Sequence, residues 1–278
     1  MNDRSLALVW FRQDLRISDN PALRAAAAAG QILPVYILDD ANSGEWAMGA
    51  ASRAWLHHSL QSLDRSLGGR LKLFAGDASE IIGSLVDKLP IRAVYWNRCY
   101  EPWRSRRDTQ IKSALTAAGI EVESFNASLL WEPWQVQKPD GGPYRVFTPF
   151  YRKGCLSSEP PREPLAPPDE LPGAALSIAG CLPLDALELL PRENWYRDLL
   201  GHWRVGEQGA RRRLEEFCDT AIADYRDARD FPAREATSRL SPHLHFGEIS
   251  PHQAWHRAGQ AAMHERGDGP AHFQRELA

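Results

Sequence analysis

The sequence predicts an α/β protein: a Rossmann-like, doubly wound parallel sheet of five strands, followed by a long linker and the start of an all-helical domain. Three observations support this. Over residues 6–127, short apolar, β-rich runs alternate with helical segments, a pattern that favours parallel strands with right-handed crossovers. Ten of the twenty prolines then fall in residues 133–172, and helical patterns return after residue 194.

Five runs are expected to be the strands, because each is short, apolar and bounded by polar or turn residues. They are residues 6–11, 32–39, 70–77, 93–97 and 121–127. Helices are expected between them, at residues 20–29, 48–67, 78–88 and 102–118. Asp19 or Asn20 can cap the first helix, with Pro21 in its first turn. Gly30 and Gly119 stand where helices should end.

The proline-rich stretch is predicted to be an extended connection over the surface, because it is long and poor in periodic apolar residues. The expected organisation therefore has three parts. They are an α/β domain at residues 1–132, an interdomain linker at 133–193 and an incomplete helical domain at 194–278.

Residues 206–225 are predicted to be helical for much of their length. An approximate apolar stripe is formed by Ala210, Leu214, Phe217 and Ile222. Opposite charges are spaced for pairing at Glu207 and Arg211, Arg211 and Glu215, and Arg212 and Glu216. Acidic residues follow the three consecutive arginines at once, so a solvated helix face is favoured over phosphate contacts.

The composition argues against several classes of protein. No run approaches the length of a membrane span, and the N-terminal apolar run lacks a cleavage site, so it is predicted to be a strand. The net charge of −3 gives no support to a nucleic-acid partner, which would need a local basic surface. The cysteines lie far apart without a CxxC pair, which argues against a metal cluster and indicates reduced thiols in a cytoplasmic protein. These are Cys99, Cys155, Cys181 and Cys218.

The turn after the first strand, "FRQDLRISDNPAL", has no Gly-x-Gly-x-x-Gly pattern, which argues against a Rossmann dinucleotide site. We expect its charged residues to form a polar network that fixes this turn. These are Arg12, Asp14, Arg16 and Asp19. Ligands of parallel sheets bind beyond the carboxyl ends of the strands, so the sequence is compatible with a planar ligand in the crevice there.

The segment "TSRLSPHLHFGEISPHQAW", residues 237–255, carries the strongest binding signal. Ser241 and Ser250 each precede a proline, as helix N-caps do, and Gly247 can end the first of the two helices. Hydroxyl groups, exposed amides and the Arg239 guanidinium suit a phosphate group. From the residues alone, ordinary helix capping and phosphate binding are equally favoured.

Four histidines in or next to this segment raise the question of a metal site. They are His243, His245, His252 and His256. Helical phase places the last two on one face, but no carboxylate or cysteine completes a ligand set. Core or surface histidines are therefore the favoured interpretation.

Several long motifs, in order, resemble those of the DNA photolyase/cryptochrome family. They are "VWFRQDLRISDNPAL", "NRCYEPWRSRRD", "YRVFTPFYR", "WRVGEQGARRRLEEF" and "YRDARDFPAREATSRLSPHLHFGEISPHQAW". The similarity covers essentially the whole chain. The wording "HLHFGEIS" is most similar to that of a bacterial class I cyclobutane pyrimidine dimer photolyase.

The resemblance implies an α/β antenna domain, a linker and a helical FAD-binding domain in a usually monomeric lyase. The implied reaction is the light-driven, FAD-dependent splitting of pyrimidine dimers in UV-damaged DNA. Arg229 matches a DNA-contacting position, and Glu276 matches the catalytic acid that hydrogen-bonds the damaged pyrimidine pair. The implied FAD contacts, which strongly favour phosphate binding by the segment above, are Tyr225, Thr237, Ser238, Arg239, Leu240, Ser241 and Phe273.

The chain departs from the family's pattern in two places. It ends at Ala278, where the family continues for roughly another two hundred residues, so half of the FAD pocket is expected to be absent. We therefore expect this chain to bind FAD weakly or not at all and not to repair DNA. Trp103 and Arg104 stand where folate-binding members carry Asn and Glu, which leaves the antenna chromophore unidentified. A surface aromatic and a solvated charge are favoured there over contacts to an anionic chromophore.

Two alternative functions accompany the photolyase interpretation. A cryptochrome-type blue-light receptor shares these motifs but signals instead of repairing, and Glu276 favours repair over this alternative. The other is a stand-alone Rossmann-like antenna or nucleotide-binding module without catalysis.

Overall fold

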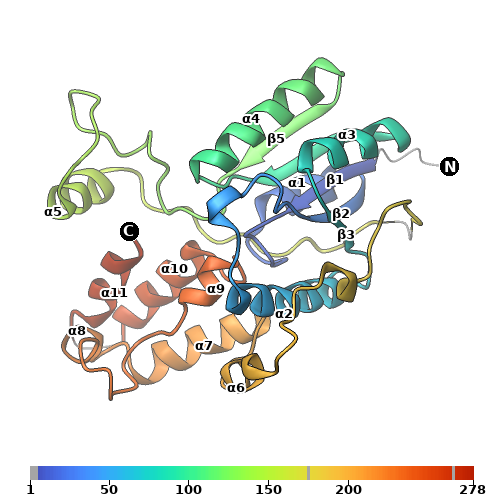
Figure 1. Cartoon of the computed structure of the whole chain (residues 1–278). Helices are drawn as coiled ribbons and strands as arrows, with labels where there is room; N and C mark the ends of the chain where they lie inside the picture. The colour runs from blue at the N-terminus through green and yellow to red at the C-terminus, as the bar shows by residue number, and fades with distance from the viewer. Residues whose placement is uncertain (1–5, 174–175, 265–266) are drawn as a thin grey trace.

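A computed structural model of the chain describes residues 6–173, 176–264 and 267–278. Its centre is the predicted sheet of five parallel strands, in the order β3-β2-β1-β4-β5 (Figure 1). The strands are β1 (Leu6–Phe11), β2 (Gln31–Leu38), β3 (Lys72–Ala75), β4 (Ile91–Asn97) and β5 (Glu121–Phe125). Every boundary lies within two residues of the expected one. β1 is central and buried along its whole length, as parallel strands covered on both faces are.

Four helices cover the sheet in two layers. They are α1 (Pro21–Ala29), α2 (Ala50–Ser66), α3 (Ala78–Lys88) and α4 (Pro102–Ala117). Alternate β1 side chains enter opposite cores, because successive strand residues face opposite sides of the sheet. Val9 packs with the α1 and α2 side chains, whereas Leu8 packs with those of α3 and α4. The doubly wound α/β prediction is confirmed.

The first helix begins as its sequence indicates. Asn20 Oδ1 accepts a hydrogen bond from the Leu23 amide at 3.0 Å, and Pro21 occupies the first helical position. Asp19 is not the cap: its carboxylate instead accepts hydrogen bonds from Arg162 Nη1 at 2.5 Å and the Leu165 amide at 2.9 Å. The linker is thereby attached to the turn after β1.

The connection after β5 is extended through its proline-rich part, as expected, but not throughout. Residues 147–157 form short helical turns: α5 (Phe147–Pro149), a π-helical turn η2 (Phe150–Gly154) and a 3-10 turn η3 (Cys155–Ser157). Figure 1 shows this part standing away from the sheet. Further 3-10 turns are η1 (Gly44–Trp46) and η4 (Leu184–Leu187). The proposed domain boundaries stay a prediction.

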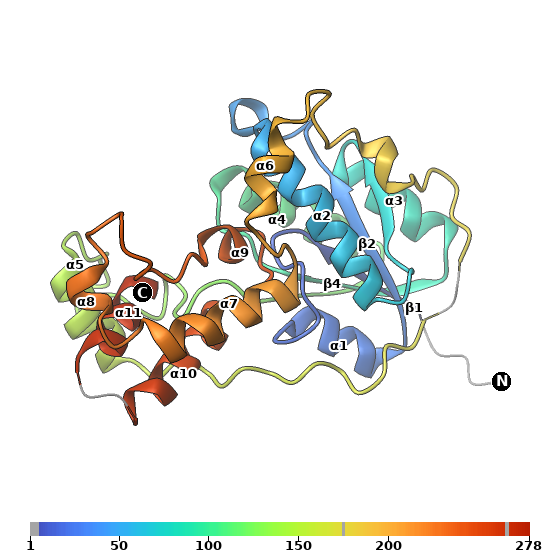
Figure 2. The ribbon, with the colours of Figure 1, turned by 90° about the horizontal axis from the view of Figure 1, so that it is seen from below.

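Among the described residues, six helices follow the linker: α6 (Trp195–Gly201), α7 (Glu207–Thr220), α8 (Tyr225–Ala228), α9 (Ser241–His245), α10 (Pro251–Ala262) and α11 (Gly269–Leu277). Figure 2 shows α7 running from beside α2 and α6 towards α8 and α11. The predicted stripe is buried in one core with α10 and α11 side chains, although its last residue, Ile222, lies just after the end of α7. In the described residues no helix is both long enough and apolar enough to cross a membrane.

Two of the three predicted charge pairs on α7 form. Arg211 lies 3.4 Å from Glu207, and Arg212 lies 2.7 Å from Glu216. The expected pair of Arg211 with Glu215 is wrong, because Glu215 Oε2 instead accepts a hydrogen bond from Arg257 Nε on α10 at 2.6 Å. Tertiary packing thus redirects one side chain of a locally predicted series.

The two serine–proline pairs behave differently. Ser250 caps α10 as predicted, in a capping box with Gln253, whose amide donates to Ser250 Oγ at 3.0 Å. Ser241 is not an N-cap: Leu240 already has helical dihedral angles, so Ser241 is the first residue of α9 and makes no capping bond. Gly247, with φ of +65°, follows α9 as predicted.

The predicted polar network after β1 is confirmed and extends to distant segments. Arg16 is 1% exposed and donates to three carbonyl oxygens. These are Asp19 O at 2.7 Å, Ala127 O at 2.9 Å and Gly247 O at 2.9 Å. Glu207 accepts hydrogen bonds from the amides of Ile17 at 2.8 Å and Ser18 at 3.0 Å. The first loop is therefore bonded directly to the helical part.

Candidate functional site

A crevice of about 430 Å³ opens at the carboxyl ends of β1, β2 and β4. This is the point where the strand order reverses, the usual ligand position in such sheets. Its walls come from the segments after β1 and β2 and from the start of α4, with His245 and Phe246 contributed by the helical part. Burial of Tyr36 in this crevice raises the pKa of its hydroxyl group, so it is a neutral hydrogen-bonding group at pH 7.

Trp103 and Arg104 are half-buried and both line this crevice, so the expectation of a solvated charge at Arg104 is wrong, whereas that of a surface aromatic at Trp103 is not contradicted. Arg104 Nη1 donates to Gln13 Oε1 at 2.6 Å, and its guanidinium lies 5.1 Å from the Trp103 ring centroid. The Arg104 side chain is 18% exposed. The first turns of α4 bring both residues to the ends of the strands, which local sequence could not show.

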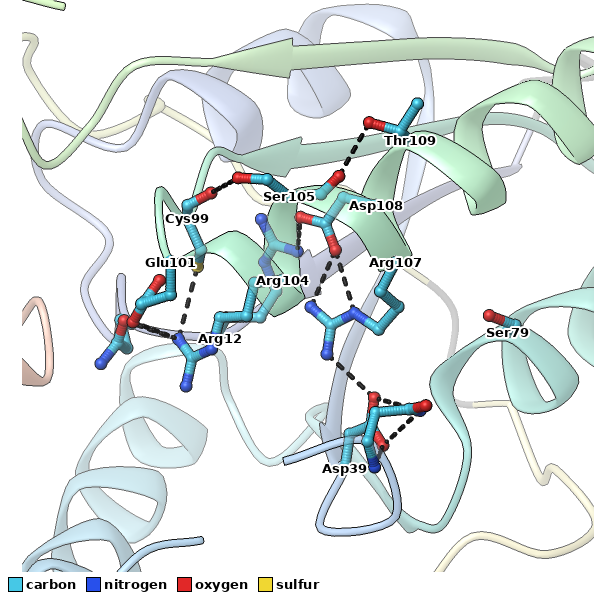
Figure 3. Close-up of polar contacts among 12 residues, drawn as sticks. Arg12, Asp39, Ser79, Cys99, Glu101, Arg104, Ser105, Arg107, Asp108 and Thr109 are labelled. Carbon is cyan, nitrogen blue, oxygen red and sulfur yellow. Dashed lines mark hydrogen bonds and ion pairs between the residues drawn. The ribbon is translucent and has the colours of Figure 1, made fainter. Parts of the chain in front are cut away.

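Behind Arg104 lies a buried ion-pair network (Figure 3). The sequence predicted a polar network around Arg12 but not these partners. Asp108 accepts from Arg12 at 2.8 Å and from Arg107 at 2.8 Å. Arg107 also reaches Asp39 at 2.9 Å, at the end of β2. The guanidinium groups of Arg12 and Arg107 lie 4.4 and 4.6 Å from the Trp10 ring centroid. The network fixes the crevice floor, because its charges are paired and held in a low-dielectric site.

The segment at residues 237–241 presents polar groups at the surface of the helical part. Thr237, Arg239 and Ser241 are exposed and Ser238 is half-buried, whereas Leu240 is 1% exposed and anchors the segment in the core. Arg213 on α7 donates to the Ser238 and Thr237 carbonyl oxygens at 2.9 and 3.1 Å. Arg239 has a φ of +51°, a left-handed conformation that is uncommon for a residue with a side chain.

The chemistry of this segment fits a phosphate group. Among the described residues the hydroxyl groups of Thr237 and Ser241 have no hydrogen-bond partner within the chain. Arg239 makes a single bond, to Glu235 at 3.1 Å, which leaves further guanidinium donors free. Hydroxyl and guanidinium donors are the groups that bind a pyrophosphate. The donor set is therefore suitable, although no described contact identifies the ligand.

The aromatic residues assigned to the flavin lie in the core beside this segment. Phe273 packs against Phe217 with ring centroids 4.9 Å apart and against Tyr225 at 5.4 Å. Burial raises the pKa of the Tyr225 hydroxyl. Tyr225 and Phe273 are 8% and 3% exposed, so they form a floor under any ligand and offer it only small surfaces. Their contact with a flavin stays a prediction.

Arg229 and Glu276, assigned to DNA and the lesion, are brought together. Arg229 Nη1 lies 2.8 Å from Glu276 Oε1, and this pairing raises the pKa of Arg229. The Arg229 guanidinium also lies 5.3 Å from the Tyr225 ring centroid. His272 Nε2 lies 3.6 Å from the same Glu276 oxygen, one helical turn away on α11, and was missed because nothing in its local sequence marks it. A partly exposed carboxylate is thus held between two basic side chains.

The histidines of residues 237–255 and the neighbouring His256 make contacts within the protein. His252 is buried, and this burial, together with the charge of Arg162, lowers its pKa to about 4. His256 Nε2 contacts the carbonyl oxygens of Pro161 and Arg162, at 3.1 and 3.0 Å. His256 therefore holds the linker against α10, whereas His252 Nδ1 is buried without a hydrogen-bond partner among the described residues. In the described part of the chain no three metal-ligating side chains form a group that could hold an ion.

Comparison with known proteins places this geometry among its relatives. A family model described as DNA photolyase matches residues 7–169. A deoxyribodipyrimidine photo-lyase of Agrobacterium fabrum is 42% identical over 97% of this chain and 56% of its own length. Cryptochrome-1 of Arabidopsis thaliana is 36% identical over 94% of this chain and 39% of its own length. The chain thus spans little more than half of the photolyase and less than half of the cryptochrome.

Solved structures also show similarity to photolyases over little more than half of their length. The crystal structure of a bacterial class III photolyase from Agrobacterium tumefaciens is 40% identical, with a TM-score of 0.93 over 100% of this chain and 57% of that one. An archaeal photolyase from Sulfolobus tokodaii, described with two FAD molecules, has a TM-score of 0.72 at 27% identity over 98% of this chain and 57% of that one. The expected resemblance to class I in particular is not confirmed, since the first of these structures is described as class III.

Proposed function

The chain belongs to the DNA photolyase family, and from this premise we propose that it provides one side of the flavin and lesion site of a light-driven deoxyribodipyrimidine photolyase. The observation that carries the proposal is the Arg229–Glu276 pair beside the Tyr225 ring. Tyr225 shares a helical core with Leu240, the anchor of the hydroxyl-rich segment. Phosphate donors, an aromatic floor and a carboxylate therefore occur on one helical unit.

FAD is the group that this side of the site would hold. The hydroxyls of Thr237, Ser238 and Ser241, with the Arg239 guanidinium, would bind its phosphates, and Tyr225 and Phe273 would support its other end. When bound and reduced, FAD supplies the electron that opens the cyclobutane ring of a pyrimidine dimer.

The protein residues at the lesion would bind and orient the pyrimidine dimer. Glu276 offers carboxylate oxygens to the pyrimidine N–H and amide groups of a flipped-out dimer. Arg229 holds the Glu276 carboxylate in place, and its positive charge can neutralise a nearby phosphate. His272 limits the rotation of the Glu276 side chain from one helical turn away.

Binding measurements test this proposal. Fluorescence anisotropy would compare an oligonucleotide that carries one thymine dimer with its undamaged copy, in the dark. We expect the Glu276→Gln variant to lose about tenfold in preference for the dimer, because a hydrogen bond to a charged group contributes about 1.5–3 kcal/mol.

The matched control is Glu215→Gln, because Glu215 is also a partly exposed carboxylate paired with an arginine, at 2.6 Å from Arg257. It lies on α7, outside the proposed lesion site. The control should keep the preference of the wild type. An unchanged preference in Glu276→Gln would remove Glu276 from the lesion site.

A cryptochrome-type photoreceptor is the second candidate, favoured by the 36% identity to Cryptochrome-1. The two proposals differ in their dependence on lesions. Flavin binding without any preference for dimer-containing DNA would support the photoreceptor, whereas light-dependent splitting would support the photolyase. Chromatography of irradiated oligonucleotides measures the splitting directly.

The crevice at the strand ends is proposed to hold the antenna chromophore. The Trp103 ring and the Arg104 guanidinium beside it suit a planar, anionic chromophore, which would stack on one and pair with the other. Titration with flavin mononucleotide or a deazaflavin, followed by fluorescence, tests this. The Trp103→Ala variant should weaken binding about tenfold, the equivalent of about 1.4 kcal/mol, and unchanged binding would place the chromophore elsewhere.

A further inference from the structure

A basic cleft runs along the outer side of α7, away from the Arg229–Glu276 pair. It consists of two hollows, of about 370 and 580 Å³, that share the residues Arg204, Gly209 and Arg212 as a common wall. Ser62 and Arg65 of α2 lie at one end of it, and Arg239 and His243 lie at the other. The five arginines that line this basic cleft are Arg65, Arg204, Arg212, Arg213 and Arg239.

The cleft carries uncompensated positive charge. Glu216 is its one acidic lining residue among those described, and both Arg212 and Arg213 lie near it, at 2.7 and 3.7 Å. Arg65 and Arg204 are exposed, and within the described residues neither has a carboxylate within 4.0 Å. Since the whole chain has a net charge of −3, this positive charge is a local feature and not a general one.

The cleft is built on closely packed backbone. A Cβ atom at Gly209 would lie 1.5 Å from Arg204 O, and one at Gly206, where φ is +102°, would lie 2.2 Å from Ser62 Oγ. The loop before α7 therefore sits directly against α7 and α2. Its residue Trp203 packs against Trp55, with ring centroids 5.4 Å apart. Arg204 is thus held at the rim by a rigid support and not by a free loop.

The sequence favoured a solvated face for the three consecutive arginines of α7. In the structure two of them, Arg212 and Arg213, enter the cleft, and Arg213 is fixed by its bonds to the Thr237 and Ser238 carbonyl oxygens. Figure 2 shows α7 passing from α2 and α6 to the segment before α9. The arginines of the cleft therefore come from α2, the loop before α7, α7 itself and the segment before α9.

We infer that the basic cleft binds a run of phosphate groups, as in the backbone of a nucleic acid or in inorganic polyphosphate. Guanidinium groups bind phosphates through paired hydrogen bonds. Arg65 and Arg204 have no carboxylate partner among the described residues, and the other three arginines share Glu216 and Glu235, so the cleft keeps guanidinium donors for successive phosphates of one chain. Trp203 is the one large aromatic ring among the described lining residues, and it is already packed on Trp55. Binding therefore depends on charge and not on the base sequence, and it is independent of lesion recognition by Glu276.

The test measures binding of a fluorescent, undamaged single-stranded oligonucleotide by anisotropy at several salt concentrations. The Arg65→Gln/Arg204→Gln variant removes two unpaired cations. We expect its affinity to fall about tenfold at low salt, and the slope of log K against log salt to decrease by about 1.4, since each phosphate contact contributes about 0.7 on single strands. The matched control is Arg24→Gln/Arg92→Gln, in which both arginines are exposed and lie outside the cleft.

Three outcomes decide the inference. A reduced slope in the cleft variant, with an unchanged slope in the control, supports it, and equal losses in both variants overturn it as general charge attraction. Unlabelled polyphosphate is then added as a competitor. If it displaces the oligonucleotide from the wild type but not from the cleft variant, both polymers bind in the basic cleft. The cleft variant itself separates the two proposals, because Arg65→Gln/Arg204→Gln should keep the wild-type preference for dimer-containing DNA while its salt slope falls.

Discussion

Replacing Arg16 with methionine tests how the first loop is joined to the rest of the molecule. The Arg16 guanidinium donates to the carbonyl oxygens of Asp19, Ala127 and Gly247, which lie in three separate segments. Methionine preserves most of the side chain's apolar volume but removes every donor. The three carbonyl groups would then stay buried without that partner.

The expected loss follows from these contacts. Each buried carbonyl group left without a donor costs about 1–3 kcal/mol, so three of them cost about 3–9 kcal/mol. Removal of a buried guanidinium offsets several kcal/mol of this, because its desolvation is no longer required. We expect a net decrease of about 3 kcal/mol in the free energy of unfolding. For a chain of about this size the thermal midpoint would fall by about 6–12 °C.

Urea unfolding followed by tryptophan fluorescence measures the change, with Arg24→Met as control because Arg24 is exposed on α1. The stability of Arg16→Lys should lie between those of the wild type and Arg16→Met, since one ammonium group cannot reach all three carbonyl groups. If the free energies of unfolding of Arg16→Met and the control differ by less than about 0.5 kcal/mol, the argument from unpaired carbonyl groups is refuted.

Three further predictions concern the segment that follows α9. Gly247→Ala should lower the thermal midpoint by an amount equivalent to at least about 2 kcal/mol, because φ is +65° and the new Cβ would lie 2.0 Å from Gln13 O. Ser250→Ala should lower the free energy of unfolding, measured with urea, by about 1 kcal/mol, because the α10 capping box is lost. His252→Gln should flatten the pH dependence of stability. The pKa of His252 is lowered to about 4 by burial and by Arg162, so its contribution is present above pH 6.5 and is lost as the pH falls to about 4.

Each of these has a clear contrary result. An unchanged midpoint for Gly247→Ala would mean that the turn after β1 yields to the added methyl group. A loss of stability for Ser250→Ala that is matched by Gln253→Ala confirms the capping box, whereas a neutral Ser250→Ala contradicts it. Identical pH profiles for wild type and His252→Gln between pH 6.5 and 4 would show that another group titrates there.

Most of the fold could be predicted because it depends on local periodicity. The five strands and the four helices that cover them lie within two residues of their predicted positions, since each apolar run and each turn is readable over a short window. The α5 turn was missed because Pro149 suggests extended chain. There the rings of Phe147 and Tyr151 stack 6.0 Å apart, which favours a compact turn.

The candidate sites were predicted less completely, because their geometry depends on residues far apart in the sequence. Arg12 and Asp108 are separated by 96 positions and meet only once β1 and α4 are in place. The basic cleft likewise needs α2 beside the loop at residue 204. Sequence motifs named the chemistry of residues 237–241, but they could not show which distant arginine would fix that segment.

The bonds between the first loop and the helical part also constrain the order of folding during synthesis. The amides of Ile17 and Ser18 find their acceptor in Glu207, and one Arg16 donor finds its partner at Gly247. At translation rates of about 5–20 residues per second, Gly247 is made on the order of 10–50 seconds after this loop. Throughout that interval the polar groups of the turn after β1 must form their hydrogen bonds with water. A ribosome-bound chain that stops short of α7 should therefore leave this turn unusually accessible to protease.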